Sequence, residues 1–385
     1  MTVPADSLMG TGPEVLNMYK TYFPDPPGGL QEAIRQTALA TTEAGVCNRL
    51  FTLSPRPKPA RIDFPEMAVH RCRAWAAPAS CDLGGTGALR TFRQLARQAD
   101  LLHYYFPWPF ADLLDLAAPR GTPAIMTYVS DVVRQKWLGR AYQPLMWRTL
   151  RRMRIIVANS PAYRETSPVL SHPVLRDRVR VIPLGIDETR YDSRPDPEIF
   201  ARVGVSPGEP FLLFLGVLRY YKGLPFLLRA ARGLDVPVVV AGSGPEQARL
   251  AAQVRDEGIA NVRFAGQVSH AEKVALLSAC VGLVLPSHLR SEAYGMVLVE
   301  ASMFGKPMVS CAIGTGTSFV NQHERTGLVV PPESPLALQE ALRCLLDDPG
   351  QAEAWGRAAR ARYEECFSGA ALGKAYAELY REVAG

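Results

Sequence analysis

The sequence predicts an α/β protein built from two doubly wound parallel-sheet domains. Its 385 residues exceed what one hydrophobic core usually organises, which indicates two domains. Short apolar segments alternate with longer helical patterns along the chain, and this alternation is typical of a parallel sheet. The strand candidates of the second half are continuously apolar, as expected for a sheet that helices cover on both faces.

The first half is expected to begin with a strand over residues 15–23, the turn PDPPGGLQ and a helix over residues 30–44. Further strands are expected over residues 48–53, 67–71, 101–105, 124–128, 155–158 and 179–183. A polar, proline-bearing linker, YDSRPDPE, follows the segment PLGID and marks a domain boundary. We therefore expect domains at 1–188 and 189–368, and a last helix over 369–385 that crosses back to the first domain.

The second half repeats the alternation, with strands expected over residues 211–217, 237–242, 262–266, 281–286 and 307–311. Several of these strands end in small or polar residues, such as Gly216, Gly266 and Ser287. Each such ending taken alone is compatible with a simple tight turn. Because ligands of open parallel sheets bind beyond the carboxyl ends of the strands, the recurrence of these endings predicts a nucleotide cleft there.

The stretch PSHLRSEAYGMVLVEASMFGKP, residues 286–307, carries two carboxylates, Glu292 and Glu300. A helix is expected from residue 296, with Glu292 just before its N-terminus and Glu300 inside it. Eight residues of helix separate two side chains by about 12 Å along the axis and about 80° around it. The two acids can each grip vicinal hydroxyls of a nucleotide-sugar, while backbone N–H groups near Tyr294 and Gly295 face its phosphates. The alternative is a capped helix with one surface acid.

Two cations, Arg219 and Lys222, follow the first strand of the second half and lie three residues apart. A helical turn would place both on one face, where a guanidinium fork and a movable ammonium suit the charge on a leaving diphosphate. The alternative is surface charge beside a helix start. In the first half, Gly28 and Gly29 let the backbone approach a ligand, but no G-x-G-x-x-G motif is present, which argues against nicotinamide chemistry.

The net charge of +6 is concentrated in residues 1–188, which hold 23 basic and 16 acidic residues. Between Asp131 and Glu165 no acid occurs, while basic residues are interleaved with Trp137, Tyr142, Met146 and Trp147. The basic residues are Arg134, Lys136, Arg140, Arg148, Arg151, Arg152, Arg154 and Arg164. This pattern predicts contact with an anionic membrane surface or a phosphate-rich acceptor. Nucleic acid is disfavoured because no binding motif accompanies the charge, and a solvated helix face is the alternative.

The seven cysteines are scattered and form no C-x-x-C pair, so we expect reduced core thiols in a cytoplasmic protein. No basic region precedes an apolar run at the amino terminus, and no run of eighteen apolar residues occurs. Neither export nor a membrane span is therefore expected.

Several motifs together resemble family 4 glycosyltransferases of the GT-B fold: GGL, PLGID, RYYKG, AGSGPE, FAGQV and, above all, the E-x7-E of SEAYGMVLVEA. Four longer segments resemble bacterial mannosyl- and rhamnosyltransferases of O-antigen and exopolysaccharide assembly: FPWPFADLL, SDVVRQKWL, NSPAYRETSPVL and IGTGTSFVNQHERTGLVVPP. The resemblance covers almost the whole chain. It implies two Rossmann-like domains that face a central cleft.

The resemblance also implies the reaction. A hexose, mannose or rhamnose, would pass with retention and without a metal from a GDP-sugar, first of all GDP-mannose, to a saccharide acceptor. The acceptor would be carried on a polyprenyl diphosphate or be another saccharide. The enzyme would lie in the cytoplasm, peripherally attached to the inner face of the cell membrane. The nucleotide-sugar is a substrate, and no cofactor is implied.

Carried over by residue, the resemblance assigns Glu300 to the donor ribose and Glu292 to the hexose. It assigns Arg219 and Lys222 to the β-phosphate. Backbone contacts to the donor are assigned to Gly28, Gly29, Tyr294 and Gly295.

The chain departs from the family pattern at three positions. Val217 stands where an arginine is common, and Tyr105 and Val129 stand where histidines are common. His103 and Asp131 are therefore the remaining polar candidates on the acceptor side, with a packed strand residue as the alternative for His103. Retaining transfer needs no base from the enzyme if the departing phosphate takes the acceptor proton.

Two other functions stay open at this point. Another GT-B nucleotide-sugar enzyme, such as an epimerase, would need carboxylates placed for proton abstraction beside the hexose. A non-catalytic partner in a glycan-assembly complex would need no grip on a diphosphate, so the acid pair and the Arg/Lys pair favour the transferase.

Overall fold

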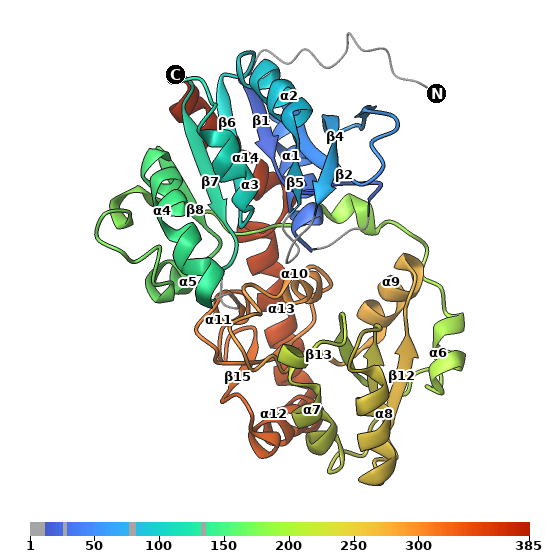
Figure 1. Ribbon diagram of the computed structural model, residues 1–385. Helices are drawn as coiled ribbons and strands as arrows, with labels where there is room; N and C mark the ends of the chain where they lie inside the picture. The colour runs from blue at the N-terminus through green and yellow to red at the C-terminus, as the bar shows by residue number, and fades with distance from the viewer. Residues whose placement is uncertain (1–11, 26–28, 77–81, 132–135) are drawn as a thin grey trace. The chain divides into compact units, whose positions relative to one another are not determined.

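The computed structural model describes residues 12–25, 29–76, 82–131 and 136–385 (Figure 1). It divides into two compact units: unit 1 comprises Met1–Gly185 and Gly369–Gly385, and unit 2 comprises Ile186–Ser368. The division falls three residues before the boundary that we expected from the sequence. The last helix belongs to unit 1.

Unit 1 contains a nine-stranded sheet in the order β3-β4-β2-β1-β6-β7-β8-β9, with β5 paired to β4. The strands are β1 (Glu14–Met18), β2 (Cys47–Ser54), β3 (Arg61–Asp63), β4 (Ala68–Ala76), β5 (Leu83–Gly84), β6 (Leu101–Phe106), β7 (Ala124–Tyr128), β8 (Ile155–Ala158) and β9 (Val179–Val181). The pairs β3·β4 and β4·β5 are antiparallel, and the other pairs are parallel. The sequence did not predict the two short antiparallel strands, and the first strand ends at Met18 rather than at residue 23.

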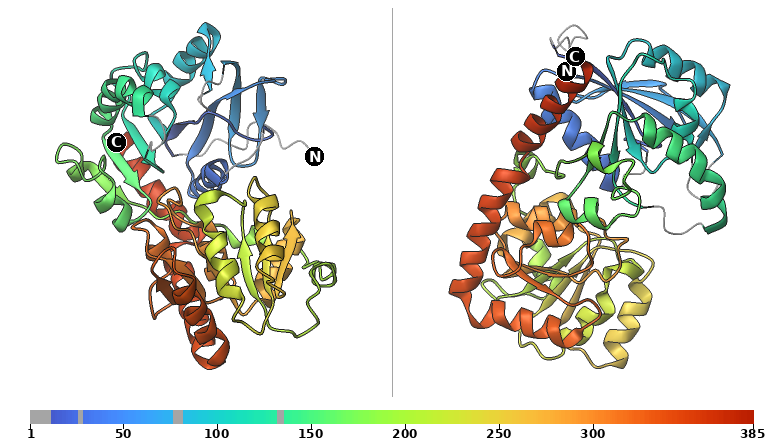
Figure 2. Two further views of the ribbon diagram at one scale, coloured as in Figure 1. Left: turned by 60° about the horizontal axis from the view of Figure 1, so that its bottom comes forward. Right: turned by 90° about the vertical axis from the view of Figure 1, so that its left-hand side faces the viewer.

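Helices cover both faces of this sheet: α1 (Gly29–Glu43), α2 (Thr86–Ala96), α3 (Pro109–Asp115), α4 (Lys136–Arg152), α5 (Pro161–Thr166) and α14 (Gly369–Ala384). The right-hand view of Figure 2 shows α14 on one side of the sheet and α2 and α4 on the other. Leu372 and Val383 of α14 join one core cluster with Leu101 and Ile125 of the strands. On the other face, the ring of Phe92 in α2 lies 6.0 Å from that of Phe51 in β2.

Unit 2 contains a six-stranded parallel sheet in the order β12-β11-β10-β13-β14-β15 (Figure 1). The strands are β10 (Leu212–Leu215), β11 (Val238–Ala241), β12 (Val262–Gly266), β13 (Gly282–Leu285), β14 (Met308–Cys311) and β15 (Gly327–Val330). Every strand that the sequence predicted in this half is present, and β15 is additional. The strands β10, β11, β13 and β14 are buried along their whole length, as their continuous apolar sequences predict.

The helices of unit 2 are α6 (Glu198–Val203), α7 (Leu224–Ala231), α8 (Gln247–Asp256), α9 (His270–Ala279), α10 (Met296–Met303), α11 (Thr317–Val320), α12 (Pro335–Asp347) and α13 (Pro349–Cys366). The chain runs from β10 outward through β11 to β12, and then returns to place β13 on the other side of β10. The direction of winding therefore reverses between β10 and β13. Parallel sheets bind ligands at such a reversal, beyond the carboxyl ends of the strands.

The six cysteines within the described residues are free thiols. Cys280 and Cys311 are buried, and burial raises the pKa of each thiol to about 12. Cys344 is exposed, so the expectation that all the thiols lie in the core is wrong for this residue. It lies on α12, whose buried stripe consists of Leu338, Ala341, Leu342 and Leu345.

Candidate donor site

The carboxyl ends of β10 and β13 bring Lys222 and Glu292 together. Lys222 ends a short 3₁₀ turn (Tyr220–Lys222) after β10, and Glu292 lies in the loop between β13 and α10. The Nζ of Lys222 forms an ion pair with Oε2 of Glu292, and the Ser287 hydroxyl donates a hydrogen bond of 3.1 Å to the same oxygen. Two residues 70 positions apart are thus joined at the reversal of the sheet.

The loop after β10 can contact the loop after β13 because a glycine stands at position 223. Gly223 follows Lys222 with φ of 68°, and a Cβ atom there would lie 1.9 Å from the carbonyl oxygen of Pro286. Any side chain at position 223 would therefore separate the loop after β10 from the loop after β13. The sequence RYYKG, in which this glycine directly follows the lysine, encodes the contact that brings Lys222 to Glu292.

The Lys222–Glu292 pair is 9% exposed at each residue. Removing two charges from water to this degree carries a desolvation penalty that a buried ion pair often fails to offset. Such a pair is therefore a poor device for stability alone. A movable ammonium group held next to the end of β10 is suited to receive an anion, and a Cβ on Gly216 would lie 3.8 Å from its Nζ.

Glu300, in α10, is held by two residues that sequence analysis missed. Oε1 of Glu300 lies 2.6 Å from the Nζ of Lys273 in α9, and it also accepts a hydrogen bond from the Tyr191 hydroxyl. The same Nζ lies 3.1 Å from the Tyr191 oxygen and 4.6 Å from the centre of its ring. Lys273 and Tyr191 thus fix the direction of the Glu300 carboxylate.

A pocket of about 290 Å³ lies at the carboxyl ends of β10 and β11 and the start of α9. It is lined by Leu215, Gly216, Val217, Gly242, Ser243, Gln267, Val268, Ser269, His270 and Lys273. The loops around it are close because Gly242, with φ of 131°, has no Cβ, which would lie 2.0 Å from the Gly216 carbonyl oxygen. Lys273 both lines the pocket and binds Glu300, so the pocket and the carboxylate belong to one site.

The remaining unit 2 candidates border this site in different ways. Arg219 is exposed and precedes the 3₁₀ turn, and its carbonyl accepts the N–H of Lys222 at 3.0 Å. Tyr294 is buried. Gly295 takes φ of 81° before α10, where a Cβ would lie 2.8 Å from Leu285. A glycine is thus needed to start the helix that carries Glu300, and the first N–H groups of that helix lack carbonyl partners within it.

Those unit 1 candidates that the structure describes do not form a comparable site. Gly28 lies outside the described residues. Gly29 opens α1, is exposed, and has no atom within 4 Å of an added Cβ. Asp131 accepts hydrogen bonds from the hydroxyls of Tyr128 at 3.1 Å and Ser167 at 2.6 Å, which tie it to the end of β7 and to the segment after α5.

His103 is a packed strand residue, which was the alternative for it in the sequence. It is fully buried, and its ring nitrogens lie 2.8 Å from the Tyr380 hydroxyl and 2.7 Å from the Thr127 hydroxyl. Burial lowers the pKa of His103 to about 3. Tyr105 is also buried, with its hydroxyl 3.4 Å from Oδ1 of Asn17. Both side chains are engaged inside unit 1, between the sheet and the helices that cover it.

Two arginines of the acid-free stretch, residues 132–164, form ion pairs with an acid that lies outside it. Arg148 and Arg152 of α4 both pair with Asp115 of α3, whose side chain is completely buried. Arg152 also donates to the Thr122 carbonyl at 3.1 Å. An acid outside the stretch therefore occupies two of its cations. Arg134 and the side chains of Lys136, Trp137 and Arg140 lie outside the described part of the chain.

None of the helices in the described residues is both long enough and apolar enough to cross a bilayer.

Two family models match the chain: "Glycosyl transferase 4-like domain" over residues 28–185 and "Glycosyl transferases group 1" over residues 195–362. The chain is 44% identical to D-rhamnosyltransferase WbpZ of Pseudomonas aeruginosa over 358 residues, which cover 92% of each protein. It is 38% identical to O-antigen chain mannosyltransferase C of Escherichia coli over 366 residues, which cover 95% of this chain and 97% of that protein.

Solved structures share the architecture. Sucrose-phosphate synthase from Thermosynechococcus elongatus has a TM-score of 0.77 at 23% identity, covering 96% of this chain and 98% of that one. Anabaena HepE, in a complex with UDP, has a TM-score of 0.77 at 18% identity, covering 96% of this chain and all of that one. At these identities the similarity concerns the fold.

Proposed function

Because the chain belongs to the glycosyltransferases, we propose that it moves a mannose or rhamnose unit from a GDP-sugar to a saccharide acceptor in bacterial surface polysaccharide synthesis. The expected family and GT-B fold are confirmed by the two family models, the curated relatives and the solved structures. The names of the two relatives, a D-rhamnosyltransferase and an O-antigen chain mannosyltransferase, support the choice of sugar and of the polysaccharide.

The observation that carries the proposal is that two carboxylates and two ammonium groups lie together in unit 2, where the winding of the sheet reverses. Glu292 is held by Lys222, and Glu300 by Lys273. In the proposed complex, the nucleoside occupies the pocket of about 290 Å³ and the Glu300 carboxylate accepts hydrogen bonds from the ribose hydroxyls. Glu292 accepts hydrogen bonds from the hexose hydroxyls.

The proposed chemistry is the departure of a nucleoside diphosphate from the anomeric carbon, with retained configuration. Negative charge grows on the β-phosphate as the glycosidic bond breaks, and a cation placed there stabilises the transition state more than the bound substrate. We assign this role to Lys222, whose ammonium lies at the end of β10, with Arg219 as its exposed neighbour. We propose that no metal ion takes part.

The departing phosphate is proposed to take the proton of the acceptor hydroxyl. The new glycosidic bond then forms on the face from which the diphosphate leaves, so no side chain has to act as a base. The burial of His103 and its two hydrogen bonds support this choice, because a histidine so engaged has no free nitrogen for an acceptor. Asp131 and Tyr105 remain as proposals for shaping the acceptor side.

The acceptor is proposed to be a saccharide on polyprenyl diphosphate, and the protein a peripheral one at the cytoplasmic face of the cell membrane. A mixed pool of nucleotide-sugars tests the proposal, because consumption of a GDP-hexose with formation of GDP and a glycosidic product identifies a transferase. Conversion of the sugar without release of GDP would instead identify an epimerase. No turnover, with a lipid-linked oligosaccharide present, would favour a non-catalytic partner. A chelator should leave the rate unchanged, and strict dependence on an added divalent ion would contradict the metal-free assignment.

A further inference from the structure

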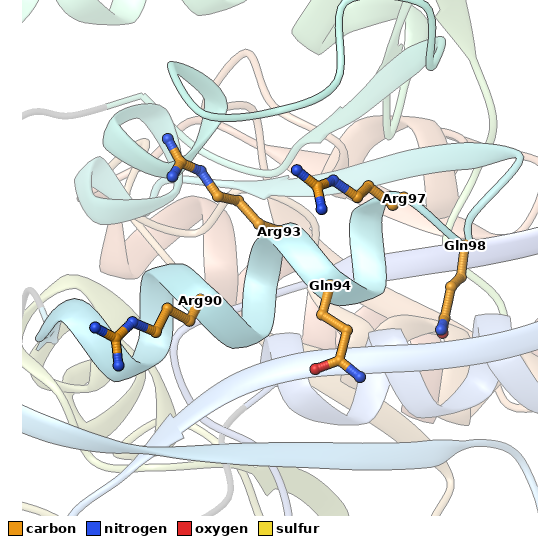
Figure 3. A pocket seen from close by; sticks show the side chains of 5 residues that line it. All are labelled: Arg90, Arg93, Gln94, Arg97 and Gln98. Atoms are coloured by element: carbon orange, nitrogen blue, oxygen red, sulfur yellow. The ribbon is translucent and has the colours of Figure 1, made fainter.

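A strip of arginines on α2 has no role in the donor site. Arg90 and Arg93 lie in α2 and Arg97 is its C-cap residue, and because they are three and four residues apart they share one side of the helix. Figure 3 shows their guanidinium groups projecting from this part of unit 1. All three are exposed, and none forms an ion pair within the part of the chain that the structure describes. No acid occurs in the sequence between Asp82 and Asp100.

The strip borders a shallow hollow of about 360 Å³ whose lining residues are Arg90, Arg93, Gln94, Arg97 and Gln98. The lining holds three permanent positive charges and two amides, and it holds no carboxylate. Guanidinium groups keep their charge at every physiological pH and can grip phosphate with two parallel hydrogen bonds. The chemistry of the hollow therefore suits a phosphate-bearing surface.

The opposite side of α2 packs on the sheet and so determines where the three arginines lie. Ala88, Phe92, Leu95 and Ala96 are buried, so the helix packs firmly on the sheet and its arginines face outward. The end of β5 lies between α2 and α3, because a Cβ on Gly84 would meet both Ala88 and Phe110. The two helices are thus neighbours on one face of unit 1.

The neighbouring helix α3 exposes apolar side chains. Leu113 is 46% exposed and Leu116, which directly follows α3, is 55% exposed. They lie three residues apart, whereas Leu114 between them is buried, and the exposed Arg120 follows them. Guanidinium groups beside exposed leucines form the combination that peripheral proteins present to a bilayer, where charges meet headgroups and leucines enter the interface.

We propose that this face, formed by Arg90 and Arg93 of α2, its C-cap residue Arg97, and the leucines Leu113 and Leu116, docks on an anionic bilayer. It takes the role that the sequence pattern gave to the stretch 132–164, where Asp115 occupies Arg148 and Arg152. The leucines favour a bilayer over a nucleic acid, because a nucleic acid has no apolar layer for them to enter. The proposed lipid-linked acceptor supplies the purpose of this docking, but the docking itself is measured without turnover.

The test is flotation of the full chain with phosphatidylcholine vesicles that contain phosphatidylglycerol, and with vesicles of phosphatidylcholine alone. The wild type should float with the anionic vesicles at low salt and much less with the neutral ones. Each well-placed arginine contributes roughly fivefold, so the triple variant R90E/R93E/R97E should lose about a hundredfold in partitioning. The charge-preserving variant R90K/R93K/R97K should keep most of the binding.

Two control variants distinguish this face from the other basic surfaces of the chain and from net charge alone, and a third variant tests its leucines. The variant R232E/R249E/R357E makes the same change in net charge with exposed arginines of unit 2, and it should float like the wild type. The variant R151E/R164E alters exposed arginines of the stretch 132–164 and should lose much less than the α2 variant. The variant L113S/L116S should lose the fraction of binding that survives high salt.

Equal flotation of the α2 variant and the wild type would overturn the proposal, as would an equal loss in the unit 2 control. Failure of the wild type to prefer anionic vesicles would also overturn it. GDP titration by calorimetry keeps this result separate from the proposed function. An α2 variant that binds GDP like the wild type but no longer floats is folded and has lost only the membrane face, whereas a wild type that floats but does not bind GDP refutes the donor assignment alone.

Discussion

The Nζ of Lys273 lies 2.6 Å from Oε1 of Glu300, and the Tyr191 hydroxyl binds the same oxygen. Lys273 also lines the pocket that we assign to the nucleoside. A carboxylate held at one oxygen by an ammonium and a phenol keeps its second oxygen in a defined direction. Lys273 is therefore a positioning residue for the proposed ribose grip.

Replacing Lys273 with methionine should weaken GDP binding about tenfold or more, because hydrogen bonds to a well-placed charged group contribute about 1.5–3 kcal/mol each. The specific signature is discrimination between GDP and 2′-deoxy-GDP, which the wild type should show and K273M should largely lose. Calorimetry with both nucleotides measures this. The matched control K306M, in the same unit, should keep the wild-type discrimination. A K273M protein that still rejects the deoxynucleotide would show that Lys273 does not orient Glu300.

Replacing Lys222 with methionine should slow turnover about a hundredfold or more while donor affinity changes less, because a cation on the leaving phosphate acts mostly in the transition state. Steady-state kinetics with the GDP-sugar separates the two effects. Unchanged kcat in K222M would remove Lys222 from the proposed chemistry.

The same substitution should also destabilise the protein, by about 3 kcal/mol, because it leaves the buried Glu292 carboxylate without its partner. The double variant K222M/E292Q should regain most of this stability in urea unfolding, but none of the activity. A double variant as unstable as K222M would mean that the loss does not come from the unpaired charge.

Val129, at the end of β7, stands where family members commonly have histidine. If the departing phosphate is the base, V129H should not raise the rate with a GDP-sugar. Strong activation by V129H would mean that the native protein lacks a needed base. That result would favour the function of a non-catalytic partner. The variant V129N, which adds polarity without a basic nitrogen, controls for a change in pocket shape.

Asp112, in α3, should make part of the stability of unit 1 depend on pH. Burial raises the pKa of Asp112 to about 7, although Tyr142 donates a hydrogen bond to it. The unfolded carboxyl titrates near its ordinary value of about 4. The folded state therefore holds the proton more tightly, so this contribution is fully present below about pH 4 and is lost as the pH rises through 7. The stability of wild type relative to D112N should fall between pH 5 and 7, and a constant difference would contradict the assignment.

The alternation of elements was predictable because strands buried on both faces must be continuously apolar. The strands β10, β11, β13 and β14 illustrate this. The short strand β3 was not predictable from the sequence, because its segment RID contains only one apolar residue. Its position in the sheet comes from antiparallel pairing with β4. Such pairing depends on the tertiary neighbour rather than on local sequence.

The residues of the candidate site that lie close together in the sequence were predictable. Those that come from distant segments were not. Glu292 and Glu300 share one helix and its preceding loop, and Lys222 precedes a glycine that the fold requires. Lys273 and Tyr191 come from other segments, 27 and 109 residues from Glu300. An acid inside an apolar helix indicates that a cation lies nearby, but only the sheet order shows which one. The basic stretch shows the same limit, since its own sequence did not reveal that Asp115, which lies outside it, pairs with Arg148 and Arg152.

Turnover of GDP-sugars by the purified chain with a polyprenyl-diphosphate-linked oligosaccharide tests the central claim most directly. In a mixed pool of nucleotide-sugars, we expect consumption of GDP-mannose or GDP-rhamnose alone, release of GDP, extension of the acceptor by one residue and an anomeric configuration that matches the donor. A product of inverted configuration, or extension from a UDP-sugar with the GDP-sugars left intact, would contradict the account.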